Sequence, residues 1–359
     1  MKDFYNKYVD DIRETLRTAR PRNAINKAVV SNFSGITDRS YAALNLNREK
    51  TVMLSQKRDL ELFESLHSLD EISGKKTNYH LRPGEHPDFI HIRDENSFDN
   101  YEIVSVFIDI SNSTGLFKKY YPLTVANITN TIQRAAVHTC WYFDGYIQRY
   151  HGDGLFVYFG GRKVAKKDAI IQALKATSLF TYFVKNDLKN LFYEQGIENI
   201  YTRIGMDFGE SEDVLWYMAG MGACSEITTC SLHTSLASKM QDQANSNAIV
   251  VGDHVRDLSE LDKNLYDYVR DSKKEIKRRY IFEIPEDGFY YTQWDFDWEN
   301  YLKSLNYNSP NADQNRLNAL RQTANLVTAG EAYTDIAGNI KTEPTGVKNQ
   351  EHRFHYESK

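Results

Sequence analysis

The sequence predicts an α+β fold, a sheet covered by helices, and three observations lead to this class. Short β-branched and aromatic runs alternate with amphipathic runs of helical period between about residues 100 and 258. Two of the short runs flank a tight Gly-containing turn, 151–154, which is typical of a β-hairpin. The length of 359 residues is enough for one large or two modest domains with a proper core.

The elements are expected in the order strand, helix, strand, strand, helix, strand. YEIVSVFIDIS is a β-branched run of the kind that forms a strand buried on both faces. The runs in chain order are 101–111, 123–140, 146–150, 155–160, 166–188 and 201–209, followed by a third helix at 232–243 and a strand at 248–252. This β-α-β-β-α-β order is that of a ferredoxin-like sheet with its helices on one face.

Three regions are expected along the chain. Residues 1–95 form a helical, polar N-terminal extension, which ends in the turn-rich connector LRPGEHPDF (81–89). Residues 96–303 hold the sheet. Residues 304–359 are polar and rich in Asn, Thr and Gly, which predicts a flexible C-terminal tail.

Composition excludes several classes of protein. Charged residues make up 26% of the chain and the net charge is −5, so no general affinity for nucleic acid or an anionic membrane is expected. The three cysteines have neither zinc-site nor disulfide-framework spacing. The charged N-terminus lacks the apolar run of a signal peptide, and no run approaches the ~20 apolar residues of a membrane helix. We expect a soluble, cytoplasmic protein.

Two carboxylates are expected to meet at one edge of the sheet. Asp109 ends the first strand, and Asp153 lies in the hairpin turn between Gly152 and Gly154. Neighbouring carboxylates repel each other, and a divalent cation neutralises them. Taken alone, Asp109 fits an ordinary turn or cap aspartate equally well. That role does not explain why two aspartates lie at the same edge of the sheet. Two cations bridged by such a pair serve in-line displacement at phosphorus.

The residues after Asp109 are candidates for a triphosphate contact. The segment SNSTG (111–115) opens a helix, and Ser113 or Thr114 is expected to cap it. Asn112, Ser113 and Thr114 would then leave free N–H groups directed at a bound anion.

Four separated blocks resemble the class III nucleotidyl cyclases in sequence and spacing. VFIDISNSTGL resembles the first metal motif of that family, and YIQRYHGDGLFVYFG resembles its Gly-Asp-Gly hairpin. RIGMDFGE and SLASKMQDQANSNAIVVGDHV resemble the later strand and the helix-strand unit. The resemblance covers residues 100–258.

The resemblance implies a site for two divalent cations, Mn²⁺ or Mg²⁺, on Asp109 and Asp153, with the carbonyl of Ile110 completing one position. In such enzymes the cations activate the ribose 3′-hydroxyl for attack on the α-phosphate of a nucleoside triphosphate. It also implies a homodimer, in which one subunit supplies the cation ligands and the other supplies the base contacts.

The chain departs from the family at four positions. Arg149 and Thr228 stand at the base-reading positions, where adenylate cyclases have lysine and aspartate. Ser235 and Lys239 stand where the family has an asparagine and an arginine that stabilise the transition state. Three of these residues have an ordinary alternative: Arg149 as part of a surface pair, and Ser235 and Lys239 as solvated helix residues.

These substitutions resemble the bacterial uridylate and cytidylate cyclases of the Pycsar antiphage systems. Thr228 lacks the charge to accept from the amino group of cytosine, so the sequence predicts UTP as substrate and cyclic UMP as product. The alternatives are a cytidylate cyclase, a divergent adenylate cyclase and an inactive regulatory module. The turn HGDGLF argues against a diguanylate cyclase, which carries Gly-Gly-Asp/Glu-Glu-Phe there.

Overall fold

The computed structural model describes residues 2–19, 81–95, 97–194, 196–197 and 199–305, with two short strands beyond them. The chain divides into two compact units, Lys2–Leu302 and, with Met1, Lys303–Lys359. In the second unit, β12 (Tyr333–Thr334) and β13 (Ile340–Lys341) pair antiparallel. Residues 20–80 of the expected extension and most of the expected tail (304–359) lie outside the described residues. The three-region division therefore remains a prediction.

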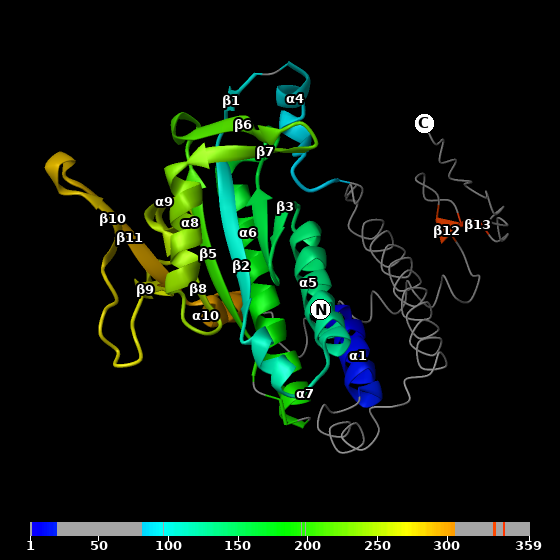
Figure 1. Ribbon diagram of the computed structural model, residues 1–359. Helices are drawn as coiled ribbons and strands as arrows, with labels where there is room; N and C mark the ends of the chain where they lie inside the picture. Colours follow the sequence, from blue (N-terminus) through cyan, green and yellow to red (C-terminus); the bar gives the residue numbers. More distant parts are fainter. Residues whose placement is uncertain are drawn as a thin grey trace, which may run out of the picture. The chain divides into compact units, whose positions relative to one another are not determined.

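The core of the first unit is an eight-stranded sheet in the order β10-β11-β8-β5-β2-β4-β3, with β9 also beside β11 (Figure 1). The strands are β2 (Ile103–Ser111), β3 (Tyr146–His151), β4 (Gly154–Phe159), β5 (Tyr201–Gly209), β8 (Ala248–Gly252), β9 (Tyr266–Tyr268), β10 (Tyr280–Ile284) and β11 (Phe289–Phe296). β5 and β8 run parallel, and the other neighbours are antiparallel. This mixed sheet with its helices confirms the predicted α+β class.

The ferredoxin-like unit is formed by β2 to β5 with α5 (Pro122–Tyr142) and α6 (Lys166–Tyr182). Its strands lie in the order β5-β2-β4-β3. β2 is the central strand, and its first four residues, 103–106, are all buried. α5 contacts β3 and β4 while α6 contacts β2 and β4, so the two helices cover one face of the sheet.

The third predicted helix, α8 (Leu232–Gln243), lies outside this unit and covers the opposite face. A Cβ on Gly205 of β5 would lie 2.1 Å from the carbonyl oxygen of Ala237, so only glycine allows α8 this close to the strand. Three positions away along β5, Thr202 bonds Thr181 of α6 at 3.3 Å. Neighbours an odd number apart point to opposite faces. Figure 1 shows α8 and α5 on either side of β2.

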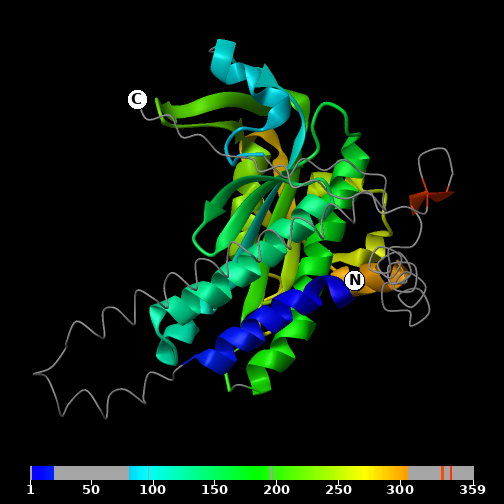
Figure 2. The same cartoon turned by 90° about the vertical axis from the view of Figure 1, so that its right-hand side faces the viewer.

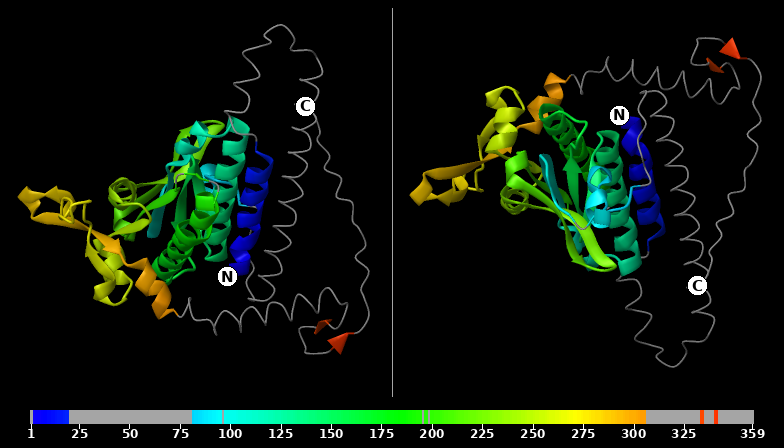
Figure 3. Two further views of the ribbon diagram at one scale, coloured as in Figure 1. Left: turned by 90° about the horizontal axis from the view of Figure 1, so that it is seen from below. Right: turned by 90° about the horizontal axis from the view of Figure 1, so that it is seen from above.

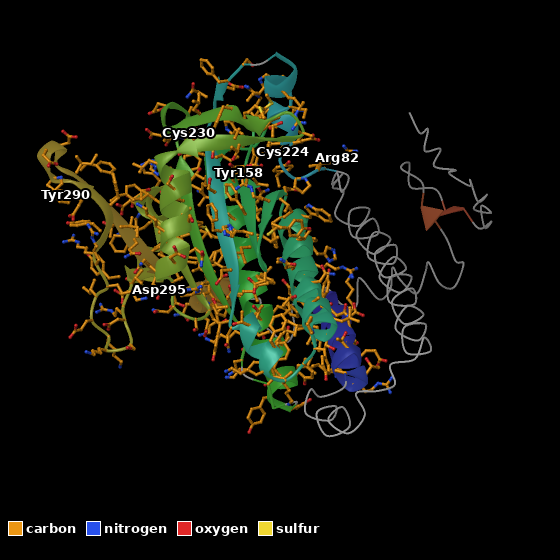
Figure 4. All side chains as sticks on the ribbon, viewed as in Figure 1. Arg82, Tyr158, Cys224, Cys230, Tyr290 and Asp295 are labelled. Atoms are coloured by element: carbon orange, nitrogen blue, oxygen red, sulfur yellow. The ribbon has the colours of Figure 1, made fainter. Side chains whose placement is uncertain are left out.

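A second, three-stranded sheet was not predicted from the sequence. β6 (Val214–Met221) and β7 (Cys224–Ser231) form an antiparallel ribbon, with β1 (Asp99–Asn100) beside β6. Figure 4 labels Cys224 and Cys230 on this ribbon and Tyr158 of β4 near it. The hydroxyl of Tyr158 lies 2.9 Å from that of Thr229, and Phe89 stacks on Trp216 at 3.9 Å between ring centroids. The connector 81–89 therefore packs on the ribbon.

The described start of the N-terminal extension is helical, as expected. α1 (Lys2–Thr18) lies beside α5 in Figure 2. Tyr5 pairs its hydroxyl with that of Thr139 at 2.8 Å, and the Tyr8 hydroxyl lies 2.6 Å from Nδ1 of His138. These buried polar contacts fix the register of α1 on α5.

Short helices and turns complete the described chain. They are η1 (Pro87–Phe89), α4 (His91–Glu95), η2 (Ser113–Lys118), the π-helical η3 (Phe183–Leu188), α7 (Lys189–Glu194), η4 (Ser211–Asp213), α9 (Asp253–Leu258), η5 (Lys263–Leu265), η6 (Pro285–Asp287) and α10 (Trp298–Ser304). The β10–β11 hairpin extends away from the helices α5 and α6 (Figure 3). Within the ranges given above, no helix has both the length and the apolar character required to span a bilayer.

Candidate active site

A pocket of about 690 Å³ lies where β2 ends and the β3–β4 turn begins, with α5 along one side. Its lining includes Asp109, Asp153 and residues 110–114, which follow the first of them. The lining residues are Asp109, Ile110, Ser111, Asn112, Ser113, Thr114, Phe117, Pro122, Val125, Ala126, Thr129, Gln133, Gly152, Asp153 and Arg203. The structure thus brings together six of the ten predicted site residues, from 109 to 153.

Strand register places the two aspartates side by side. Ile108 of β2 lies opposite Leu155 of β4, so Asp109 comes level with the hairpin turn. A Cβ on Gly154 would lie 2.2 Å from the carbonyl oxygen of Ile108, so only glycine allows the turn to approach β2 this closely. Gly152 adopts φ +61, a conformation that glycine takes without strain. The backbone geometry of the turn therefore requires glycine at 154 and favours it at 152. Asp153, between them, lines the pocket.

Asp109 is held through one oxygen. Arg203 lies directly opposite it on β5 and donates to Oδ2 from Nη2 at 2.7 Å and from Nε at 3.1 Å. The hydroxyl of Ser111 donates to the same oxygen at 2.6 Å. Sequence reasoning missed Arg203, because its strand was identified by periodicity alone. A signal was present, since a basic residue in a buried strand needs an acidic partner.

Asp153 is also held through Oδ2, which accepts a hydrogen bond from the hydroxyl of Ser113. Gln133 of α5 donates to the carbonyl of Gly152 at 3.0 Å and fixes the turn against the helix. For both aspartates, the bonds from the described chain go to Oδ2, which leaves Oδ1 for another ligand. Asp109, Asp153 and Ile110 line one pocket. Their carboxylates, with the main-chain carbonyl expected of Ile110, would make a hard-oxygen donor set that suits Mg²⁺ or Mn²⁺.

The expected capping role of Ser113 or Thr114 is wrong. The segment forms the 3₁₀ turn η2, and its N-cap is Asn112 with φ +68 and no side-chain capping bond. The Ser113 hydroxyl donates to Oδ2 of Asp153 instead. Asn112 instead donates from Nδ2 to the carbonyl of Asn199 at 2.8 Å. Helix α5 begins later, at Pro122.

The predicted base-reading residues lie outside this pocket. Arg149 on β3 forms an ion pair with Glu226 on β7, with Nε donating to Oε2 at 3.0 Å. Thr228 is 8% exposed, and its hydroxyl lies 3.4 Å from that of Tyr158. Glu226 was not singled out in the sequence, because its whole ribbon was missed.

Ser235 and Lys239 likewise do not line the pocket. The hydroxyl of Ser235 donates to the Ser231 carbonyl at 3.0 Å, and the ammonium of Lys239 lies 5.8 Å from the centroid of the Phe282 ring. Both residues are on α8, whereas the pocket is bounded by α5 on the other face of the sheet. One chain therefore does not bring its α8 residues and its aspartates into one pocket.

A buried acid-base cluster anchors the start of α8. His233 Nδ1 lies 2.8 Å from Oδ2 of Asp207, whose Oδ1 accepts from the Tyr291 hydroxyl at 2.9 Å. Burial raises the pKa of Asp207 despite these hydrogen bonds. Burial also lowers the pKa of His233, but the hydrogen bond and charge of Asp207 outweigh it, so the net shift is upward. His233 precedes Ser235 by two positions, so this cluster fixes the helix that presents Ser235.

Comparison with known proteins gives named relatives. A cytidylate cyclase of Staphylococcus aureus is 35% identical over 288 residues, which cover 80% of this chain and 65% of the relative. A cytidylate cyclase of Escherichia coli is 32% identical over 255 residues, covering 68% and 55%. The chain thus spans less than two thirds of the length of these relatives.

Among solved structures, the adenylyl cyclase CyaB from P. aeruginosa aligns with a TM-score of 0.46 and 17% identity, over 56% of this chain and 95% of that one. No family model matches the chain. The matches to the curated relatives cover most of its length, and residues of the two motifs expected to bind metal line the pocket. The chain belongs to the class III nucleotidyl cyclase family.

Proposed function

We propose that the chain is a pyrimidine nucleotide cyclase that converts CTP to 3′,5′-cyclic CMP and pyrophosphate. The observation that carries this proposal is the pocket that Asp109, Asp153 and Ile110 line together, where each carboxylate accepts through Oδ2 from the described part of the chain. When bound, two divalent cations (Mn²⁺ or Mg²⁺) supply Lewis-acid activation of the ribose 3′-hydroxyl and neutralise the triphosphate.

The chain's own residues position the reactants. Arg203 and Ser113 orient the two carboxylates, and the turn after Asn112 shapes the mouth of the pocket. Lys239 supplies positive charge at the α-phosphate. Ser235 donates to the ribose once its hydroxyl turns away from the Ser231 carbonyl, to which it donates here. Because α8 lies on the opposite face from the pocket, we propose that these two residues come from the partner subunit of a homodimer.

The choice of CTP rests on two considerations. The relatives are named cytidylate cyclases. Glu226 also adds a carboxylate acceptor beside Arg149. The prediction of UTP considered only Arg149 and Thr228 and did not include this acceptor. UTP remains the second candidate, because Thr228 itself carries no charge to accept from an amino group.

The resemblance to Pycsar cyclases extends the proposal to biology: the cyclic product is a second messenger of antiphage defence. Phage-infected cells that express the chain should accumulate the cyclic pyrimidine nucleotide, and cells expressing Asp153→Ala should not.

The direct test is incubation with each of the four nucleoside triphosphates and Mn²⁺, with chromatography of the cyclic product and an assay of pyrophosphate. We expect CTP to be converted fastest, UTP more slowly and the purines poorly. Turnover of ATP or GTP above both pyrimidines would contradict the pyrimidine assignment. Absence of any cyclic product under Mn²⁺ and Mg²⁺ would favour the inactive regulatory module.

A further inference from the structure

Arg149 on β3 and Glu226 on β7 form a fixed donor-acceptor pair outside the pocket that the two aspartates line. Nε of Arg149 donates to Oε2 of Glu226 at 3.0 Å, and Nη2 contacts Oε1. The pair is not sealed off, since 50% of the Arg149 side chain and 25% of the Glu226 side chain remain exposed. A ligand can therefore reach both the guanidinium and the carboxylate.

Buried contacts on either side hold this pair in place. Gln148, the residue before Arg149, is fully buried and donates from Nε2 to the carbonyl of Ile227 at 2.9 Å. The amide of Ile227 donates to the carbonyl of Gly84 at 2.8 Å. A Cβ on Gly84 would lie 2.8 Å from Cβ of Glu226, so the connector packs directly behind the glutamate. The carboxylate is thus fixed before any ligand binds.

Glu226 shares a face with the predicted base-reading position. Side chains two apart on a strand point to the same side, so Glu226 lies on the same face of β7 as Thr228, about 6.6 Å along the strand. Its carboxylate therefore supplies, beside Arg149, the acceptor that Thr228 lacks.

The pair matches the edge of one pyrimidine better than the other. Cytosine presents an amino donor at position 4 next to two acceptors, N3 and O2, and a carboxylate is a known acceptor for that amino group. A carboxylate beside a guanidinium offers one acceptor next to several donors. Uracil places a carbonyl at position 4, where it would face the carboxylate acceptor to acceptor.

We propose that Glu226 selects cytosine over uracil, by accepting a hydrogen bond from the 4-amino group while the remaining N–H groups of Arg149 donate to N3 and O2. This inference rests on the proposed pyrimidine cyclase function. Arg149 was predicted to read the base alone, whereas here Arg149 and Glu226 select the base together.

The test compares Glu226→Gln with Glu226→Asp. Glutamine keeps the shape but presents an amide that can donate to the uracil carbonyl. We expect the ratio of kcat/KM for CTP to that for UTP to fall about tenfold or more in Glu226→Gln, as a lost hydrogen bond to a polar group implies. Glu226→Asp keeps the carboxylate and should retain a preference for CTP. The matched control is Glu210→Gln, since Glu210 pairs with Lys166 at 2.7 Å outside both the pocket and the ribbon.

Each outcome decides the inference. A ratio in Glu226→Gln within twofold of that of the unmodified chain overturns it, as does an unmodified chain that prefers UTP. Calorimetric binding of CTP and UTP to the same variants reads the base preference independently of turnover. If no nucleotide is turned over but binding shows the expected shift, the proposed cyclase activity fails while the role of Glu226 stands. Thermal unfolding checks that each variant is folded.

Discussion

Arg203 on β5 lies directly opposite Asp109 on β2, and two of its nitrogens donate to the same carboxylate oxygen, at 2.7 and 3.1 Å. This geometry fixes the rotation of the carboxylate and turns Oδ1 away from the arginine. The positive charge also offsets one of the two negative charges that would otherwise repel each other in the pocket. We therefore propose that Arg203 positions Asp109 as a cation ligand.

Replacing Arg203 by lysine should reduce kcat/KM about tenfold or more, even though the charge is kept. An ammonium group cannot reproduce the two parallel bonds of the guanidinium, and small displacements of catalytic groups are costly. The measurement is steady-state kinetics with a Mn²⁺ titration, in which the concentration of metal needed for half-maximal rate should rise. Arg278→Lys is the control, because Arg278 forms a comparable 2.8 Å ion pair with Glu283 on the β10–β11 hairpin. Activity of Arg203→Lys within twofold of the unmodified chain would remove the positioning role.

Substitution of either aspartate, as Asp109→Ala or Asp153→Ala, should abolish product formation to below a few per cent. Each change removes a cation ligand, and a loss of ~100-fold corresponds to about 2.7 kcal/mol of transition-state stabilisation. Stability should change little, by about 1 kcal/mol, because both side chains are partly exposed and repulsion between them is relieved. Chemical unfolding of the same variants checks this. Turnover above a few per cent with Mn²⁺ would contradict the two-cation assignment.

Sequence periodicity predicted the ferredoxin-like core because each of its strands is a short, separate apolar run. The β6–β7 ribbon escaped prediction for a physical reason: CSEITTCS is polar, and its strands are stabilised by Trp216 packing on the connector residue Phe89, a long-range contact. Without the ribbon, Glu226 could not be recognised as the partner of Arg149. The sequence also could not predict which face of the sheet α8 covers, because this depends on the close approach of Gly205 to the helix.

The metal motif was the most predictable part of the site, because strand register alone brings Asp109 level with the hairpin turn. The role of Ser113 was not predictable. A serine near the start of a helix is typical of a cap, but its hydroxyl can also donate to a neighbouring carboxylate, as Ser113 does to Asp153.

His86 should make the stability of the chain depend on pH. Its ring is 3% exposed among the aromatic rings of Phe89, Tyr146 and Trp216, and burial lowers its pKa to about 4. The folded state thus binds fewer protons than the unfolded state, in which the pKa is about 6.5. The contribution of His86 is fully present above pH 6.5 and is lost as the pH falls toward 4. The shift corresponds to about 3 kcal/mol.

The measurement is the free energy of unfolding in urea at several pH values between 7 and 4. His86→Phe should flatten the decline across this window relative to the unmodified chain. His151→Phe is the control, because His151 lies exposed at the end of β3. Equal slopes for the His86→Phe variant and the unmodified chain would show that the ring does not resist protonation.

Mixing two inactive variants should restore activity if the site is shared between subunits. The aspartates and the α8 residues belong to opposite faces of the sheet. The proposed site would therefore take its cation ligands from one chain and Lys239 from another. In a heterodimer of Asp153→Ala and Lys239→Ala chains, one site carries both defects and the other carries neither. Random pairing makes half of the dimers heterodimers, each with one of its two sites intact. The whole mixture should therefore recover about a quarter of the activity of the unmodified chain. The two chains are co-expressed with different affinity tags, which confirm that heterodimers form. The unmixed variants, purified in the same way, provide the baseline. Confirmed heterodimers without recovered turnover would place Lys239 and Asp153 in the same chain's site, or remove Lys239 from catalysis altogether.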